Sequence, residues 1–368
     1  MYENPAQTVI SDEVAAGAVR WRSPSNIALI KYWGKHGQQL PQNPSVSFTL
    51  DAAATDTTLH YAPRKLSGQD IDLKLYLDGT EREDFAVRTR KFFGGLLAIY
   101  PFLRQLSFKV ETTNSFPHSA GIASSASGMS ALALCLVSLE EVLFQKLSEE
   151  DFRRKASYLA RLGSGSASRS VYGSAAVWGS SPAVPGSSDQ YALSVADDLH
   201  PTFQTYHDDI LFVSRSEKSV SSRAGHGLME QNPYAPARYQ QAARRMGEMM
   251  RSLREGDVEI FGQLLESEAL TLHALMMSSH PSYTLIEPNT LQIIGALREY
   301  REQTGHAVHF TLDAGPNVHV LYPDSIADEV RAFIRQDLLV FCDGEMYLAD
   351  RVGTGPQQLE VNTTTRVQ

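Results

Sequence analysis

The chain has 368 residues, of which 42% are hydrophobic and 20% are charged, a composition typical of a globular protein large enough for two domains. Its formal net charge of −9 argues against a nucleic-acid partner, because phosphate backbones bind basic surfaces. An anionic small molecule would therefore need a locally basic pocket.

The chain shows no targeting pattern. Residues 1–17 have neither a basic start nor an apolar core, so we expect no signal peptide. We also find no run that approaches the roughly 18 apolar residues of a membrane span, and expect no membrane partner. Cys135 and Cys342 lie in apolar runs and are expected to be reduced core residues of a cytoplasmic protein, although the sequence leaves one disulfide open.

Strand and helix patterns are mixed along the first half of the chain. The expected strands are 45–61, 72–79 and 106–114, and the expected helices are 86–100, 130–147 and the segment from Ser148 to Gly163. Ser148 opens the last helix with Ser-Glu-Glu-Asp, which is close to a capping box. A Pro/Gly/Ser-rich loop at 182–190 lies within or just before a boundary region.

The second half continues the mixture. The expected elements are a strand at 209–215, long helices over 236–279 broken near Gly256, a helix at 290–305, and strands at 306–312 and 318–323. Asn289 is the expected cap of the helix at 290–305, and Gly305 lies just past its end. Because strands and helices do not alternate strictly, an α+β fold is favoured over a doubly wound sheet.

Residues 119–128 are small and run directly into an apolar helix. Such a loop brings backbone N–H groups close to a phosphate, and the helix N-terminus adds partial positive charge. Ser124, Ser125 and Ser127 add hydroxyls for phosphate oxygens or a metal ion. The spacing is neither a Walker A loop nor a dinucleotide fingerprint. We favour phosphate binding over a flexible linker, because strand and helix bracket the stretch closely.

Lys31 and Lys35 flank Tyr32 and Trp33 just after an apolar strand. Two ammonium groups near hydroxyl and indole donors suit an anionic ligand. Alternation would place both lysines on one face if the strand continued. Taken alone, a strand end with solvated lysines explains the stretch equally well.

Two further stretches combine small residues with a single cation. Arg169 stands among residues with almost no charge, so its guanidinium needs a carboxylate or phosphate partner, supplied by a ligand or by an internal salt bridge. Residues 219–227 form a second such loop, with Ser221, Ser222 and Arg223, and this signal is weak by itself.

Asp313 stands between an apolar run and a turn of Ala314, Gly315 and Pro316. Gly tolerates positive φ and Pro presets φ near −65°, so the stretch by itself indicates a hairpin turn.

The histidines do not form a metal-ligand pattern. His306 and His309 are three apart in an expected strand and so face opposite sides of it. His319 follows across the turn without supporting Cys or Glu residues.

Together, these stretches resemble the diphosphomevalonate decarboxylases, members of the superfamily of galactokinase, homoserine kinase, mevalonate kinase and phosphomevalonate kinase. The similarity covers nearly the whole chain. The motifs that carry it are NIALIKYWGK (26–35), IASSASG (122–128), GSGSASRS (163–170), SSRAG (221–225), LDAGPN (312–317) and VGTGPQQL (352–359). IASSASG alone indicates only the superfamily, whereas NIALIKYWGK, GSGSASRS and DAGPN in this order are much more specific to the decarboxylase.

The resemblance implies a two-domain α+β fold of the small-molecule kinase type, with a deep cleft between the domains. The N-terminal ATP-binding domain is expected at 1–198. The C-terminal domain, expected at 199–368, carries the Asp313 turn, and its last residues are able to pack back on the first domain. We further expect a cytoplasmic homodimer that binds ATP, Mg2+ and diphosphomevalonate and binds neither nucleic acid nor membranes.

The resemblance also implies a reaction of the mevalonate pathway of isoprenoid biosynthesis. The 3-hydroxyl of (R)-5-diphosphomevalonate takes the γ-phosphoryl group of ATP, and loss of phosphate and CO2 then gives isopentenyl diphosphate. Asp313 would orient the hydroxyl and take its proton. Lys31 would hold Asp313 ionised and meet the phosphoryl charge. Arg169 would grip the substrate carboxylate.

Binding residues are implied in the same way. Those for the substrate are Tyr32, Lys35, Ser222 and Arg223. Those for the ATP phosphates are Ser119, Gly121, Ser124, Ser125, Ser127 and Gly128, with Ser125 also a candidate Mg2+ contact.

The chain departs from the family pattern at 173–178 and at 117–119, and either departure could alter nucleotide or substrate fit. A decarboxylase of mevalonate 5-phosphate, a mevalonate 3-kinase and a catalytically silent binding protein are alternatives. Retention of Lys31, Arg169 and Asp313 argues against the last two. The monophosphate decarboxylase stays open, because it depends on the shape of the diphosphate pocket.

Overall fold

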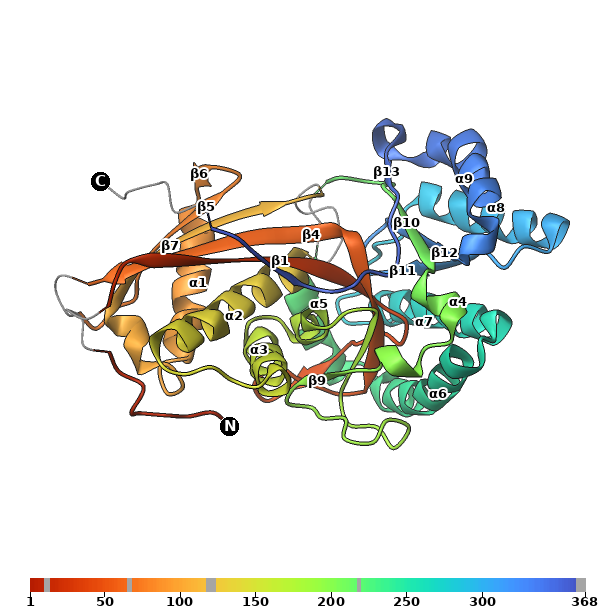
Figure 1. Cartoon of the computed structure of the whole chain (residues 1–368). Coiled ribbons are helices and arrows are strands. Elements are labelled where there is room, and N and C mark those ends of the chain that lie inside the picture. The colour runs from red at the N-terminus through yellow and green to blue at the C-terminus, as the bar shows by residue number, and fades with distance from the viewer. Residues whose placement is uncertain (10–13, 65–67, 117–123, 217–219, 362–368) are drawn as a thin grey trace.

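The structure, a computed structural model, describes residues 1–9, 14–64, 68–116, 124–216 and 220–361. Within these ranges two sheets form two regions joined side by side, with helices packed against each sheet (Figure 1). The α+β prediction is confirmed.

Eight of the described strands form the first sheet, in the order β14-β1-β4-β7-β5-β6, with β8 paired to β4 and β9 to β8. They are β1 (Gly17–Ala28), β4 (Ser45–Pro63), β5 (Asp72–Leu77), β6 (Thr80–Glu81), β7 (Leu106–Asn114), β8 (Ala175–Trp178), β9 (Ala192–Ser194) and β14 (Gln357–Leu359). Strand β4 is rich in β-branched residues, which favour extended backbone, and it pairs with three neighbours. All pairings are antiparallel except that of β5 with β7.

Three helices lie on one face of this sheet: α1 (Glu83–Gly95), α2 (Ser124–Leu143) and α3 (Glu149–Gly163) (Figure 1). The stretch Ser125–Leu143 of α2 has a mean hydropathy of 1.5, so the prediction that no segment approaches a membrane span was wrong on length and composition. However, 72% of this window is buried inside the fold, as in the central helix of a domain core.

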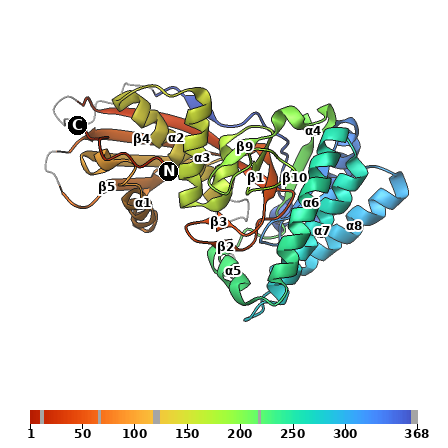
Figure 2. The same ribbon diagram turned by 90° about the horizontal axis from the view of Figure 1, so that it is seen from below.

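The second sheet has the order β11-β12-β10-β13, and helices α6, α7 and α8 lie side by side next to it (Figure 2). Its strands are β10 (His207–Leu211), β11 (His309–Leu312), β12 (Val318–Tyr322) and β13 (Tyr347–Leu348). The helices of this region are α4 (Pro201–Gln204), α5 (Ser222–Leu228), α6 (Ala235–Glu255), α7 (Val258–Met277), α8 (Pro288–Thr304) and α9 (Ala327–Phe333). A separate small hairpin pairs β2 (Lys35–His36) with β3 (Leu40–Pro41).

The two regions share a hydrophobic core. Phe48 of the first sheet packs with Phe203 and Phe261 of the second region. The chain also returns to the first sheet after β13, because β14 pairs with β1. Before that return, the buried Asp350 carboxylate accepts backbone N–H groups of residues 51, 52 and 53, each at 2.8 Å. The boundary at 198/199 stays a prediction.

The expected helix signals are partly confirmed. The Ser148 hydroxyl caps α3 by accepting the Asp151 N–H, and Gly256, with φ of 77°, ends α6. Gly305 likewise ends α8, but Asn289 is not its cap. Glu287 takes that place, because its side chain and that of Thr290 exchange hydrogen bonds with each other's backbone N–H.

Other boundaries moved. The helix expected at 86–100 is α1 and ends at Gly95, and the helix expected from 130 begins at Ser124. The expected loop 219–227 is wrong: from Ser222 it is helix α5, capped by the Ser221 hydroxyl. Both cysteines are buried and free, as predicted.

Candidate active site

Asp313 lies in the tight turn between β11 and β12, so both the hairpin interpretation and its position at a strand end are confirmed. Its carbonyl accepts hydrogen bonds from Gly315 N–H at 2.8 Å and from His273 Nε2 at 3.0 Å. The turn is fixed further along, where Thr290 donates to the Pro316 carbonyl at 2.7 Å. The half-buried Asp313 side chain therefore stands on a rigid backbone.

Lys31 follows the end of β1 and is 1% exposed, which excludes the interpretation as a solvated lysine. Its Nζ has no hydrogen-bond partner among the described residues. Burial lowers the pKa of Lys31 to about 8, while the carboxylates of Asp313, Glu268 and Asp208 act in the opposite direction. A buried ammonium without a direct partner has donors available for a ligand.

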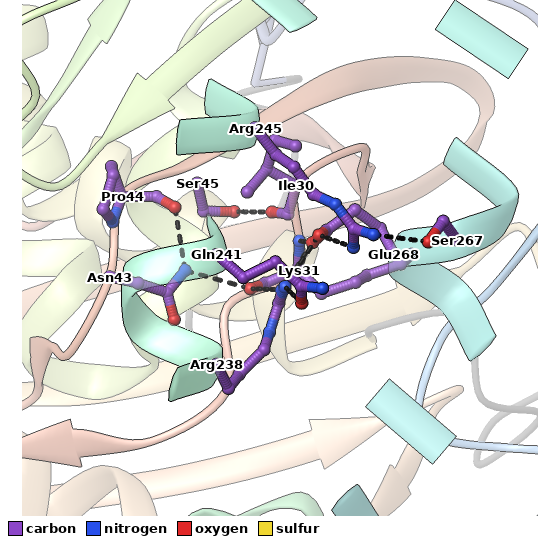
Figure 3. Close-up of polar contacts among 10 residues, drawn as sticks. All are labelled: Ile30, Lys31, Asn43, Pro44, Ser45, Arg238, Gln241, Arg245, Ser267 and Glu268. Carbon is purple, nitrogen blue, oxygen red and sulfur yellow. Dashed lines mark hydrogen bonds and ion pairs between the residues drawn. The ribbon is translucent and has the colours of Figure 1, made fainter. Parts of the chain in front are cut away.

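The backbone of Lys31 is held on both sides, as Figure 3 shows. Its N–H donates to Glu268 Oε2 at 2.9 Å. Its carbonyl accepts from Asn43 Nδ2 at 3.1 Å and from Arg238 Nη2 at 3.2 Å. The position of Lys31 is thus set by contacts from both regions of the molecule.

Arg169 lies in the 3-10 helix Gly165–Val171 and is 2% exposed. It donates to two neutral acceptors, Ser47 Oγ at 3.0 Å and Asn26 Oδ1 at 3.2 Å. The described residues give it no ion pair, and its Nη1 has no hydrogen-bond partner among them. The alternative of an internal salt bridge is therefore not supported within the described chain, and Nη1 remains available for an anion.

The three predicted catalytic residues act on one another electrostatically. Burial lowers the pKa of Arg169 to about 10, and electrostatic interactions with Tyr32 and Asp313 oppose this effect. The Asp313 carboxylate likewise opposes the lowering at Lys31. The carboxylate of Asp313 thus acts on two buried cations, and the three residues come from the segment after β1, the 3-10 helix and the β11–β12 turn.

The small residues of GSGSASRS have a packing reason. A Cβ at Gly165 would lie 2.7 Å from the Trp178 ring and 3.0 Å from the Tyr32 hydroxyl. The Tyr32 ring also packs edge-on against Trp178, with centroids 4.8 Å apart. Trp178 belongs to the 173–178 departure, so that departure lies directly behind a predicted substrate residue.

His226 is a site residue that the sequence analysis missed. Its ring lies 4.4 Å from the ring of Tyr32 and 4.5 Å from that of Trp33, measured between centroids. Gly34 N–H donates to Nδ1 at 2.9 Å, which places the proton of the neutral ring on Nε2. Burial, assisted by Lys35, lowers the pKa of His226 to about 3. The sequence signal that could have indicated His226 was its position directly after the SSRAG motif (221–225).

The predicted diphosphate residues are less uniform. Lys35 lies in β2, not on an extension of β1, so it does not share a strand face with Lys31; its Nζ donates to Gln39 at 2.9 Å. Ser222 is exposed at the start of α5, and the Arg223 side chain lies outside the described atoms.

Two hollows differ in what lines them. Lys35 and His226 line a cavity of about 200 Å³ together with Gln42, Met229, Glu230, Asn232, Ala235, Pro236 and Tyr239. A larger hollow of about 590 Å³ lies between α7 and α8 and is lined by none of the predicted site residues. The smaller cavity is therefore the one that adjoins the site.

The Gly/Ser stretch is described only from Ser124 onward. Ser119 and Gly121 lie outside the described residues, as does the Ser124 side chain. The exposed Ser125 hydroxyl lies 3.3 Å from that of Ser164, just before the helix of Arg169.

Ser127 and Gly128 differ in their surroundings. Ser127 is fully buried with its hydroxyl 2.7 Å from that of Thr55, so its predicted ATP contact gains no support from this geometry. A Cβ at Gly128 would meet nothing within 4 Å, which leaves space near the start of α2.

A nucleotide and its Mg2+ fit this end of α2. The helix supplies backbone N–H groups and partial positive charge, Gly128 leaves space, and the Ser125 hydroxyl is accessible. The described residues hold no group of three or more His, Cys, Asp or Glu side chains arranged for a metal. Nucleotide phosphates are themselves common Mg2+ ligands.

Models of two family domains match the chain. Residues 23–192 match the diphosphomevalonate decarboxylase-like N-terminal domain, and residues 210–364 match the mevalonate 5-diphosphate decarboxylase C-terminal domain. The diphosphomevalonate decarboxylase of Bos taurus is 31% identical over 344 residues, covering 89% of this chain and 82% of the relative. That of Danio rerio is 33% identical over 330 residues, covering 85% and 77%.

Solved structures agree. Mevalonate diphosphate decarboxylase from Staphylococcus aureus superposes with a TM-score of 0.80 at 28% identity, covering 94% of this chain and 99% of that one. The enzyme from Enterococcus faecalis gives a TM-score of 0.78 at 27% identity, covering 94% and 100%. A chain solved as MDDEF in complex with MVAPP, AMPPCP and magnesium gives 0.79 at 29% identity, with the same coverage.

Proposed function

Because the chain belongs to the diphosphomevalonate decarboxylase family, we propose that it converts (R)-5-diphosphomevalonate and ATP into isopentenyl diphosphate, ADP, phosphate and CO2. The observation that carries this proposal is the pair of buried cations, Lys31 and Arg169, beside the carboxylate of Asp313. A substrate with a hydroxyl, a carboxylate and an incoming phosphoryl group gives each of the three residues a partner.

The first step is phosphoryl transfer to the 3-hydroxyl. Asp313 accepts the hydroxyl proton while the oxygen attacks the γ-phosphorus and the bond to ADP breaks. Lys31 stabilises the ionised form of Asp313 and the negative charge on the transferring group. The rigid turn and the clamped Lys31 backbone fix the distance between these two groups before the substrate arrives.

The second step is elimination. The C3–O bond breaks and its electron pair leaves with phosphate, while the pair of the bond to the carboxylate carbon forms the double bond and CO2 departs. Arg169 holds the carboxylate through the free Nη1 so that this bond aligns with the departing phosphate. Asn26 and Ser47 fix the guanidinium without neutralising it.

Binding is divided between two sides. Tyr32, Lys35, Ser222 and Arg223 are proposed to bind the diphosphate, next to the cavity of about 200 Å³. The start of α2, with Ser125 and Gly128, is proposed to bind the ATP phosphates. The other residues proposed to bind these phosphates are Ser119, Gly121, Ser124 and Ser127. Mg2+, bound with the nucleotide near Ser125, would neutralise phosphate charge during transfer.

The test is product analysis with ATP and Mg2+ and, in separate reactions, mevalonate, its 5-phosphate and its 5-diphosphate. We expect ADP, phosphate and CO2 in equal amounts, with the diphosphate by far the best substrate. An Asp313→Asn protein that still binds ATP is the matched control. ADP without CO2 would support a 3-kinase instead, preference for the 5-phosphate would support the monophosphate decarboxylase, and absence of turnover would leave a binding protein.

The cytoplasmic location and the homodimer are also proposals. The two buried, unpaired cysteines support a reducing compartment. The homodimer rests on the family resemblance. Light scattering of the purified chain and fractionation of expressing cells test the two separately.

A further inference from the structure

Helix α7 (Val258–Met277) carries three buried polar side chains among its described residues, and two of them, Glu268 and His273, are 0% and 1% exposed. Five residues of helix separate them by about 7.5 Å along the axis. Buried polar groups need partners, so their hydrogen bonds show what each of them holds.

Glu268 holds the backbone of Lys31. One carboxylate oxygen accepts the Lys31 N–H at 2.9 Å, and the other accepts from Arg238 Nη1 at 2.7 Å and from Arg245 Nη1 at 2.8 Å (Figure 3). Burial alone would raise the pKa of Glu268, but the hydrogen bonds and charge of these partners bring it below its usual value. The group is therefore an anion at neutral pH.

His273 holds the backbone of Asp313. Its Nε2 lies 3.0 Å from the Asp313 carbonyl oxygen, which can only accept, so Nε2 is the donor. Leu272, together with Leu275 and Met276 of the next turn of α7, packs in one apolar cluster with Trp33 and Ala314. Helix α7 thus also contacts the segment that follows Lys31 and the segment that follows Asp313.

We infer that α7 is a positioning element for the reaction, with Glu268 and His273 setting the relation between Lys31 and Asp313. Neither residue touches the reacting atoms. Lys31 follows a strand of the first sheet and Asp313 follows a strand of the second, so a small relative shift of the two regions would change their separation. A helix bonded to both backbones suppresses that shift. This inference rests on the proposed function.

An ion cluster that serves stability alone is the competing explanation, and α7 offers a matched control for it. Glu266 is also buried, at 8% exposed, and pairs with Arg301 at 2.6 Å and Arg298 at 3.7 Å. No described hydrogen bond or ion pair links Glu266 to Lys31 or Asp313. Glu266→Gln therefore removes a comparable buried anion without touching the positioned residues.

The first arm of the test compares Glu268→Gln with Glu266→Gln by kcat, KM and thermal unfolding. Glutamine keeps an acceptor for the Lys31 N–H but loses the charge that anchors Arg238. We expect kcat to fall about 10- to 100-fold in Glu268→Gln, the effect of displacing Lys31 by up to about 1 Å. KM for ATP should stay within about twofold of the parent's value. Glu266→Gln should lower the melting temperature with kcat unchanged.

A pH profile adds a readout that loss of stability does not move. The charged groups facing Lys31 are Asp313 from the β11–β12 turn, Glu268 from α7, Asp208 from β10 and Arg169 from the 3-10 helix. Because Glu268 is one of the carboxylates that raise the pKa of Lys31, Glu268→Gln should move the alkaline limb of kcat to lower pH. Glu266→Gln should leave the limb in place.

The second arm uses His273 and remains decisive if Glu268→Gln does not fold. Leucine removes the donor, whereas glutamine places an amide N–H near the position of Nε2. We expect His273→Leu to lower kcat about 10-fold and His273→Gln to recover to within about threefold of the parent.

Equal kcat in the two His273 variants, or a Glu268→Gln protein with the parent's kcat and alkaline limb, overturns the positioning role. The parent assay separates the two proposals. Normal parent turnover with unchanged variants refutes the role of α7 alone, whereas a parent that releases no CO2 refutes the proposed function and this inference with it.

Discussion

Arg169 and Arg238 are equally buried, at 2% and 3% exposed, but their charges are met differently. Arg238 faces Glu268 through both terminal nitrogens, in a bidentate ion pair. Arg169 faces the neutral side chains of Asn26 and Ser47 and keeps Nη1 without a partner in the described chain.

The difference separates a cation that holds the fold from a cation that awaits a ligand. Burying a charge is unfavourable unless an anion compensates it, and Arg238 has that anion within the protein. Arg169 and the neighbouring Lys31 form no ion pair within the described chain, and the carboxylate of Asp313 acts on both through its charge. Substitution of Arg169 should therefore lower activity and spare stability, whereas substitution of Arg238 should lower stability.

The largest effect is expected from Asp313→Asn, which removes the carboxylate next to both under-compensated cations. We expect kcat to fall by about 10⁴-fold or more, the upper end for a general base, because the charge also orients Lys31. The fold and ATP affinity should be retained. Single-turnover assays with an ATP-binding control measure this, and turnover within tenfold of the parent would contradict the role.

Arg169→Gln should come next. A charge-assisted hydrogen bond worth about 1.5–3 kcal/mol corresponds to about 10- to 150-fold, and misorientation of the carboxylate adds to it. Arg169→Lys keeps the positive charge but loses the bidentate guanidinium, so turnover should fall by a smaller but clear factor. The measurement is CO2 release relative to ADP, and normal decarboxylation by Arg169→Gln would refute the assignment.

For stability, the substitution of Arg238 should have a larger effect than the substitution of Arg169. Arg238→Met leaves Arg245 as the one described ion-pair partner of the buried Glu268 and should lower the free energy of unfolding by about 3 kcal/mol, the lower end for a broken buried pair. Arg169→Met removes a buried charge that forms no ion pair within the described chain, so the unfolding free energy of this variant should equal or exceed the parent's. Urea unfolding of the two variants compares them directly; equal destabilisation would remove the distinction drawn between the arginines.

The lowered pKa of Lys31 predicts how stability and kcat depend on pH. Its pKa of about 8 in the folded protein lies below the ordinary 10.5, so between these values the unfolded chain binds more protons than the folded one. Stability should accordingly rise as pH increases from about 8 to 10.5, while kcat falls through about pH 8 as the ammonium loses its proton. In Lys31→Met the stability rise over this interval should disappear, and an unchanged rise would assign it to another group.

The smallest effect is expected at Gly128, on the proposed nucleotide side. Gly128→Ala should stabilise helix α2 by about 0.5–1 kcal/mol, because glycine is unfavourable within a helix and a Cβ meets nothing within 4 Å. The same methyl group would narrow the space beside the phosphates and raise KM for ATP several-fold more than KM for diphosphomevalonate. A more stable protein with unchanged KM for ATP would mean that the phosphates lie elsewhere.

The sequence by itself determined the α+β class, most strand and helix positions, and the family, because these depend on local periodicity and on short motifs. The same motifs led to Lys31, Arg169 and Asp313, which the tertiary structure brings together. Local pattern was less reliable at 219–227, where small polar residues resemble a loop but the Ser221 hydroxyl caps a helix.

Only the tertiary structure decided which charges meet. The bond from Lys31 to Glu268 joins residues 237 positions apart, and Glu268 lies in the middle of a helix with no motif around it. The same holds for His226, whose neutral state depends on burial between two aromatic rings. Desolvation and ion pairing are set by which distant segments pack together, and neither spacing nor composition along the chain encodes that.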